Sequence, residues 1–175
     1  ELGTIALPDS FRNSRVLPPR KTRQIELGSK YAANSDSLLS VSIFQMERPN
    51  EFAHSYGLNN DNRSELSQEG KVTHTGIETS WAYKATKRLN LLASAMYLEA
   101  RQSGATVRSD INPNGSQAVG VPKWRGVLFA DYMIPNYENL SVQGGWTYVS
   151  SKPVTLDNSV SVPSYHKFDL GLKYI

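Results

Sequence analysis

The sequence predicts an all-β fold of antiparallel, up-and-down strands, of the kind that crosses a membrane as a β-barrel. Three observations support this prediction: apolar and polar residues alternate in seven segments, these segments are long, and the connections between them are alternately short and long. Alternation with period two places every second side chain on the same face of a strand. Each predicted strand therefore has one apolar face and one polar face.

The alternation is clearest in segment 167–174, where even-numbered residues are apolar or aromatic and odd-numbered residues are charged or glycine. The other segments are 24–31, 39–46, 77–83, 89–97, 123–132 and 140–148. The polar rows of 39–46 and 89–97 contain apolar exceptions, Phe44 and Met46 in the first and Leu92 and Met96 in the second. Residues 89–100 are rich in alanine and have some helix propensity, but period two fits them better than 3.6.

The predicted strands run to about 10–14 residues, against a mean of about 5–6 in globular proteins. Short turns are expected at 34–36, 85–88 and 135–139, and long polar connections at 48–70, 102–121 and 151–164. In an outer-membrane barrel the short turns lie in the periplasm and the long loops outside. A soluble antiparallel sandwich also alternates apolar and polar residues, but strand length and connection pattern favour the barrel.

Aromatic residues near the predicted strand ends agree with a membrane location, because amphipathic rings prefer the headgroup level. We expect a periplasmic girdle beside the short turns, and Trp124 and Tyr148 nearer the outer one. The periplasmic set is Tyr31, Tyr83, Tyr132 and Tyr174.

Composition excludes several other classes of protein. The 175 residues are 39% hydrophobic and 20% charged, and they contain no apolar run long enough for a transmembrane helix. The absence of cysteine excludes disulfides and thiolate metal sites. The net charge of +3 is scattered, unlike the clustered charge of a nucleic-acid-binding surface. The chain lacks a Gly-x-Ser-x-Gly motif, a phosphate loop and metal-ligand spacing of its histidines, so neither an enzyme nor a metal site is predicted.

Five short motifs, in order along the chain, resemble those of the TonB-dependent outer-membrane receptors, particularly the ferric-siderophore receptors. They are Leu17-Pro18-Pro19 with Gln24 to Tyr31, Ser40 to Met46, Gly70 with Thr75 to Glu78, Gly120-Val121-Pro122 with Ala130 to Tyr132, and Val162 to Tyr165 with Asp169 to Tyr174. The resemblance implies that residues 1–175 are part of a barrel of about 22 strands around a plugged lumen. It implies that the N-terminal plug domain and the last strands lie outside this sequence.

The resemblance further implies a function in transport: uptake of ferric siderophores across the outer membrane, energised through TonB. The partners implied are the ferric siderophore, TonB, and outer-membrane lipid and lipopolysaccharide, with no nucleic acid and no directly bound cofactor. A receptor for vitamin B12, haem or a sugar, a passive porin, and a soluble β-sheet binding module remain the alternatives.

Two sets of residues are candidates for a site. By alternation Glu26 and Glu78 belong to the polar, lumen-facing rows, where they contact the plug or simply pair with neighbouring Lys and Arg in a polar wall. In the long connection 48–70, aromatic residues accompany a cation, which suits an anionic, aromatic ferric chelate, although an ordinary solvated loop is the alternative. The residues of this second set are Phe52, His54, Tyr56 and Arg63.

Overall fold

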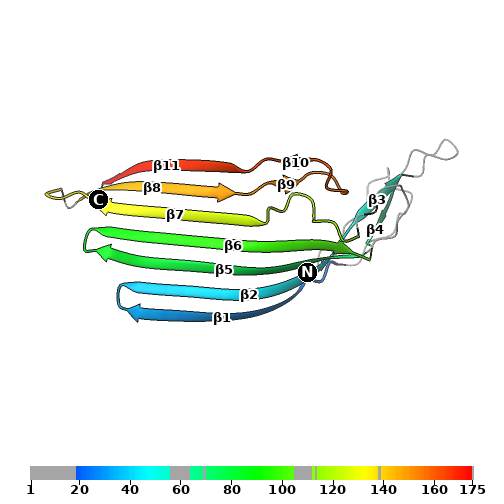
Figure 1. The fold of residues 1–175 in the computed structure, drawn as a ribbon, viewed down its shortest axis with the longest axis horizontal. Helices are drawn as coiled ribbons and strands as arrows, with labels where there is room; N and C mark the ends of the chain where they lie inside the picture. Colours follow the sequence, from blue (N-terminus) through cyan, green and yellow to red (C-terminus); the bar gives the residue numbers. More distant parts are fainter. Residues whose placement is uncertain are drawn as a thin grey trace.

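The structure is a computed structural model that describes residues 19–55, 64–68, 70–104, 112, 114–137 and 139–174; for 52–55 and 64–67 it describes the backbone alone. Seven long strands form one antiparallel sheet (Figure 1). They are β1 (Arg23–Asn34), β2 (Ser37–Pro49), β5 (Lys71–Thr86), β6 (Leu89–Ser103), β7 (Trp124–Met133), β8 (Leu140–Val149) and β11 (Tyr165–Tyr174). Their order in the sheet is their order in the chain. The predicted up-and-down arrangement is therefore confirmed.

Two small hairpins lie in the long connections, where the sequence predicted only loops. One pairs β3 (Phe52–Ser55) with β4 (Ser64–Ser67), and the other pairs β9 (Lys152–Pro153) with β10 (Ser161–Val162). Strands of two to four residues are too short for period two to reveal. None of the described residues belongs to a helix that is long and apolar enough to cross a membrane.

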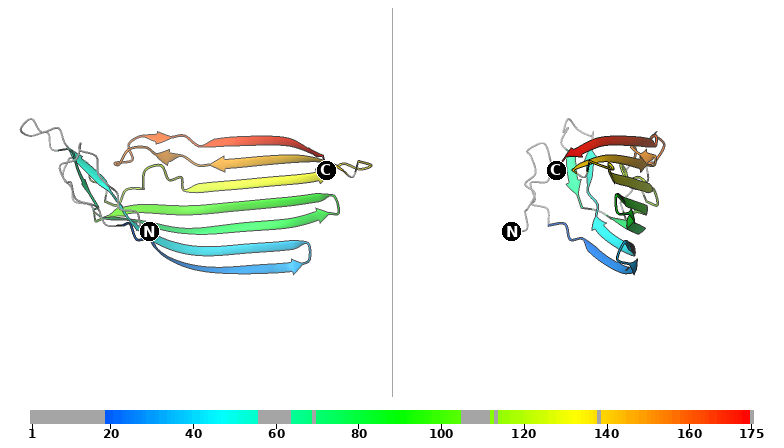
Figure 2. Two further views of the ribbon diagram at one scale, coloured as in Figure 1. Left: turned by 180° about the vertical axis from the view of Figure 1, so that it is seen from behind. Right: turned by 90° about the vertical axis from the view of Figure 1, so that its left-hand side faces the viewer.

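The register places the polar rows on one face of the sheet and the apolar rows on the other. Glu78 lies opposite Ser42 on β2 and Met96 on β6, and residues directly opposite in an antiparallel pair point to the same side. The sheet is an open arc, as the right-hand view of Figure 2 shows. Among the strands that the structure describes, β1 and β11 each pair with one neighbour only, and the barrel is not closed by them.

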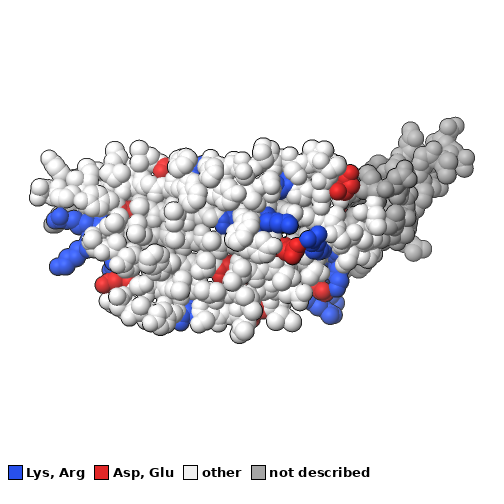
Figure 3. All heavy atoms as spheres, viewed as in Figure 1, with Lys and Arg blue, Asp and Glu red and all other residues white. Residues whose placement is uncertain are grey.

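The convex face of the arc is the apolar one. Figure 3 shows this face, and few charged side chains lie along the middle of its strands. Large apolar side chains are exposed there, such as Ile25 (78%) and Leu170 (86%). An apolar face left open to this extent is typical of a surface that contacts lipid or another protein.

Aromatic side chains border the convex face at both ends. At the short-turn end Trp81 stacks on Tyr83 with ring centroids 4.9 Å apart. At the other end Tyr97 packs against Trp124 at 4.7 Å, and Tyr148 packs against His166 at 5.0 Å. Tyr83, Trp124 and Tyr148 therefore lie at the strand ends at which the sequence placed them.

The buried core is small and lies on the concave face, where the connection after β6 folds back along that strand. Ala118 N–H donates to Ala100 O at 2.9 Å, and Gln102 N–H donates to Ser116 O at 3.0 Å. This return packs Ala118 and Val121 against Val72 and Ala100. The segment that follows Asn114-Gly115 thus continues along β6, where Gln117 and Arg101 form an isolated β-bridge.

Candidate functional site

Glu26 and Glu78, the two carboxylates predicted to face the lumen, lie on the concave wall. They line a hollow of about 880 Å³ formed by β1, β2, β5, β6 and β7. Gln24 Nε2 donates to Glu26 Oε2 at 3.1 Å, and Ser42 Oγ donates to Glu78 Oε1 at 3.2 Å. Among the residues that the structure describes, neither carboxylate forms an ion pair.

The floor of this hollow is made of small residues, mainly serine. Lys30, Ser40, Ser80, Ser94 and Val127 are consecutive partners across five strands. Lys30 at one end and Arg125 in the next row complete a wall that carries both signs of charge. Such a wall offers hydrogen-bond donors, acceptors and charges to a polar partner inside the arc.

Closer to the long loops the apolar side chains Phe44 and Met46 join the concave wall, opposite Glu26 and Gln24. Phe44 covers Gly76 on the neighbouring strand, and a Cβ added to Gly76 lies 2.7 Å from both Phe44 Cζ and the carbonyl oxygen of Tyr97. Phe44 and Met46, the two apolar exceptions in segment 39–46, therefore lie in the part of the concave wall that is nearer to the long loops. A glycine covered by an aromatic ring on the adjacent strand is a known device for stabilising a sheet.

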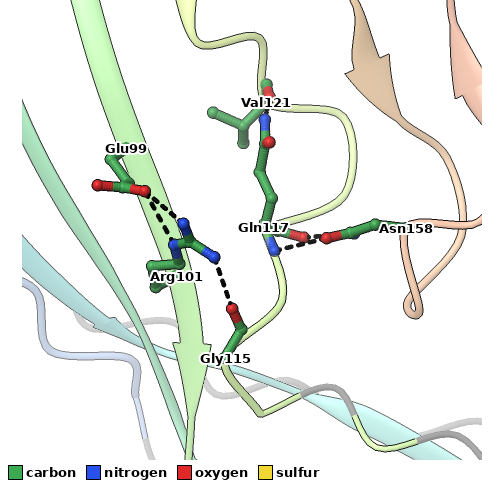
Figure 4. Close-up of polar contacts among 6 residues, drawn as sticks. All are labelled: Glu99, Arg101, Gly115, Gln117, Val121 and Asn158. Atoms are coloured by element: carbon green, nitrogen blue, oxygen red, sulfur yellow. Dashed lines mark hydrogen bonds and ion pairs between the residues drawn. The ribbon is translucent and has the colours of Figure 1, made fainter.

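At the rim, the connections after β6 and after β8 are joined by the side-chain amide of Asn158 and by a backbone hydrogen bond from Gly120 N–H to Pro153 O at 2.8 Å. Gln117 N–H donates to Asn158 Oδ1 at 2.7 Å, and Asn158 Nδ2 donates to Gln117 O at 2.9 Å (Figure 4). Gln117 Nε2 donates to Val121 O at 2.6 Å. Two residues 41 positions apart thus pair as if they were strand neighbours.

The same rim segment is attached to β6 by Arg101. Arg101 Nη1 donates to Gly115 O at 2.8 Å, and its Nε donates to Glu99 Oε1 at 3.0 Å (Figure 4). The turn that carries Asn158 has hydrogen bonds of its own, because the Ser159 N–H and hydroxyl donate to Asp157 Oδ1 at 3.1 and 2.9 Å. The nearby Thr155 hydroxyl and these two Ser159 donors lower the pKa of the Asp157 carboxyl. Gln117 and Asn158 therefore each lie in a segment that has hydrogen bonds of its own besides those of the pair.

The first long connection reaches this rim through Gln102, which is buried. Asn50 Nδ2 donates to Gln102 Oε1 at 2.9 Å, and Gln102 Nε2 donates to Ser116 Oγ at 3.2 Å. Asn50 N–H donates to Gly70 O at 3.2 Å and so closes the base of the connection. All three long connections meet at the end of β6, a convergence that the sequence did not predict.

The loop residues predicted to contact a ligand are only partly covered by the structure. The β3–β4 pairing places Phe52 opposite Ser67 and His54 opposite Glu65. Tyr56 and Arg63 lie outside the described residues. β3 lies at the same end of the molecule as the rim (Figure 1).

The family model of the TonB dependent receptor-like β-barrel matches residues 5–175. The chain belongs to this family. The family consists of transport receptors of the Gram-negative outer membrane and contains no enzymes. The family and the fold class that the sequence predicted are therefore confirmed. Membership of this family decides against the alternative of a soluble β-sheet binding module.

Among curated relatives, the chain is 26% identical over 153 residues to the ferrichrome receptor FcuA of Yersinia enterocolitica, covering 87% of this chain and 19% of FcuA. It is 23% identical over 177 residues to the ferrioxamine B receptor of Salmonella typhimurium, covering 98% and 24%. Among solved structures, the ferric preacinetobactin receptor BauA of Acinetobacter baumannii superposes with a TM-score of 0.71 at 26% identity, covering 97% of this chain and 25% of BauA. The chain thus spans about a fifth to a quarter of the length of these relatives.

Proposed function

We propose that the whole protein is an outer-membrane receptor that takes up ferric siderophores, with TonB supplying the energy. The observation that carries the proposal is the family membership of almost the entire chain, together with relatives named as ferrichrome and ferrioxamine B receptors. The ferric siderophore is the transported ligand, and no cofactor is needed for this role. Lipid and lipopolysaccharide surround the convex face in this proposal, and nucleic acid is not a partner.

In this role, residues 1–175 contribute one sector of the barrel wall. The apolar convex face turns to the membrane, the polar concave face turns to the lumen, and the joined loops form part of the outer rim. The plug domain and the last strands of the barrel belong to other parts of the whole protein in this proposal.

For the concave wall, we propose that Glu26 and Glu78 contact the plug. Each carboxylate has a single neutral donor among the described residues, Gln24 for Glu26 and Ser42 for Glu78. A carboxylate can accept several hydrogen bonds, and its strongest partners are charged donors. The unused acceptor positions therefore suit Arg or Lys side chains of a segment inside the lumen.

For the rim, we propose that Phe52, His54, Tyr56 and Arg63 contact the ferric siderophore. A guanidinium pairs with the negative charge of the chelate, and aromatic rings stack on its planar groups. We expect the double change Arg63→Ala and Tyr56→Ala in the whole receptor to weaken siderophore binding at least about tenfold, because loss of one charged hydrogen bond costs about 1.5–3 kcal/mol. Unchanged affinity in a binding titration would remove both residues from the site.

Growth under iron starvation tests the proposed function. A strain lacking the gene is supplied with one ferric siderophore at a time, beginning with ferrichrome and ferrioxamine B, and is complemented with the wild-type gene. The proposal expects at least one siderophore to support growth only when the gene is present. If uptake of vitamin B12, haem or a sugar depends on the gene and uptake of no siderophore does, the transported nutrient is a different one.

A further inference from the structure

Gln102 lies near the end of β6, where the three long connections meet. Only 3% of its surface is exposed, and it lies opposite Val72 of the small core. Burial of a side-chain amide costs free energy unless its donors and its acceptor find partners. The hydrogen bonds of Gln102 therefore decide what this residue does at the rim.

The two ends of the Gln102 amide bind two different connections. Its Oε1 accepts from Asn50 Nδ2 at 2.9 Å, in the connection after β2. Its Nε2 donates to Ser116 Oγ at 3.2 Å and to Gln117 O at 3.5 Å, in the connection after β6. Asn50 is 52 positions away along the chain and Ser116 is 14 positions away. One buried side chain therefore bridges the two connections.

The base of the first connection passes this bond on to β3. Asn50 N–H donates to Gly70 O at 3.2 Å, and Asn50 Oδ1 accepts from Glu51 N–H at 3.0 Å. The Glu51 carboxylate pairs with Arg20 at 3.0 Å and accepts from Gln68 Nε2 at 3.3 Å. β3 begins directly after Glu51. Because both sides of the base are held, the place of Asn50 sets where the hairpin of β3 and β4 leaves the sheet.

The third connection is bound to the second. Asn158 pairs with Gln117 through its side-chain amide, and Gly120 N–H donates to Pro153 O at 2.8 Å. The connections after β6 and after β8 are thus held together, and Gln102 joins the first connection to both of them.

We propose that Gln102 is a positioning residue of the siderophore site, which fixes the place of β3 relative to the other two connections. The proposal rests on the proposed function, since β3 carries the candidate ligand residues Phe52 and His54. Gln102 is buried too deeply to touch a ligand, so it acts through Asn50. Coupling of this kind is reciprocal: if the link to the connection after β6 strengthens siderophore binding, bound siderophore stabilises that connection by the same factor.

The substitution Gln102→Met tests the link, because it removes the amide and keeps an unbranched side chain. Gln143→Met is the matched control: Gln143 Nε2 donates to Asp131 Oδ2 at 3.0 Å, also on the concave face but at the short-turn end of β7 and β8. In the ligand-free whole receptor in detergent, we expect Gln102→Met to speed hydrogen exchange in peptides covering 50–55 and 114–121 about 2–10-fold. Gln143→Met should change neither. Asn50→Ala, which removes the donor to Gln102, is the second variant if Gln102→Met does not fold, and it should also speed the exchange of 50–55.

Binding and uptake of ferrichrome and ferrioxamine B separate positioning from folding. For the siderophore that wild type binds, we expect Gln102→Met to raise Kd, and KM for uptake, about tenfold, the effect of one or two lost hydrogen bonds. The maximum rate of uptake should stay the same, because poor folding lowers the number of receptors and leaves KM unchanged. Bound siderophore should slow the exchange of 114–121 in wild type and not in Gln102→Met.

An unchanged Kd, or an equal rise in Gln143→Met, would overturn the proposal. Protection of 114–121 that persists in Gln102→Met would also overturn it, because the siderophore then stabilises that segment without the Gln102 link. The proposed function fails separately: it is contradicted if wild type binds no siderophore, whereas unchanged exchange of 50–55 in Gln102→Met contradicts the positioning role alone.

Discussion

Gly76 shows how a single residue sets the spacing of the concave wall. Its missing side chain leaves room for the Phe44 ring and for the Tyr97 carbonyl, and the latter is backbone and cannot rotate away. Within the motif Thr75 to Glu78, the glycine is therefore required by packing, and the glutamate that follows two residues later is held on the same face.

We expect Gly76→Ala to destabilise the whole receptor by about 1–3 kcal/mol, the usual cost of overpacking. The measurement is the urea midpoint of folding into lipid vesicles. Gly126→Ala is the matched control, because a Cβ there has its nearest contact at 3.9 Å. If both variants fold like wild type, the Phe44 ring and the backbone of β6 shift to accommodate the added Cβ at a lower cost than the structure indicates.

Asn158, like Gly76, occupies a position that requires its particular side chain and backbone conformation. Its φ of 61° lies in the left-handed region, which asparagine tolerates better than most residues. Its side-chain amide supplies both hydrogen bonds to the Gln117 backbone. Asparagine therefore satisfies the backbone of its own turn and joins that turn to the next loop.

We expect Asn158→Gly to release Gln117 without straining the turn, since glycine accepts a positive φ. Loss of a hydrogen bond worth about 0.5–1.5 kcal/mol predicts hydrogen exchange about 2–10-fold faster at the Gln117 amide. Hydrogen–deuterium exchange of peptides covering 114–121 measures this, and peptides from β5 serve as the internal reference. Unchanged exchange at Gln117 would show that the other contacts of the segment, those of Arg101 and the backbone bonds to β6, hold it without Asn158.

At the scale of the element, alternation predicted the seven strands because one face of each meets an apolar medium. It placed one strand at 77–83, whereas β5 begins at Lys71. The first residues of β5 lie beyond the outer girdle, where Lys71 pairs with Glu47 and the convex row is polar, while Val72 on the concave face is buried in the small core. Period two in hydrophobicity therefore reports the part of a strand between the girdles and not its full length.

Of the candidate site, the concave wall could be predicted from the sequence and the rim could not. Alternation placed Glu26 and Glu78 on the concave face, since a face is a local property of a strand. The rim was not predictable, because the contact between Gln117 and Asn158 spans 41 positions and a single asparagine in a polar turn carries no signal of its partner.

Adjacent residues of β7 give a direct test of the two faces. Leu128 lies on the convex face midway between Trp124 and Tyr132, and Val127 lies on the concave face beside the serine floor. We expect Leu128→Arg to destabilise the folded barrel by about 2–4 kcal/mol, the cost of arginine at the bilayer midplane. We expect Val127→Arg to cost much less, because it faces a polar wall. Folding yields of the whole receptor in vesicles measure the difference, and equal yields would mean that the faces are wrongly assigned.

At the scale of the whole molecule, the open arc determines how this chain behaves when it is separated from the rest of the barrel. Within residues 19–174, as far as the structure describes them, both edges present unpaired backbone donors and acceptors, and such edges recruit further strands. The convex face exposes Ile25, Phe168 and Leu170, each at more than three quarters of its surface. Exposed edges and an exposed apolar face act together, because strand addition also buries apolar side chains.

We therefore expect these 175 residues, produced alone and placed in buffer without detergent, to associate into large particles detectable by light scattering. In detergent, the amides of β5 and β6 should exchange slowly, because these strands are paired on both sides, while the amides of β1 that face outward from the sheet should exchange quickly. In the whole receptor the same β1 amides should become as protected as those of β5, since barrel closure gives β1 its second neighbour. A dispersed monomer in plain buffer with protected β1 amides would contradict this prediction, because it requires the sheet to cover its own edges and its apolar face.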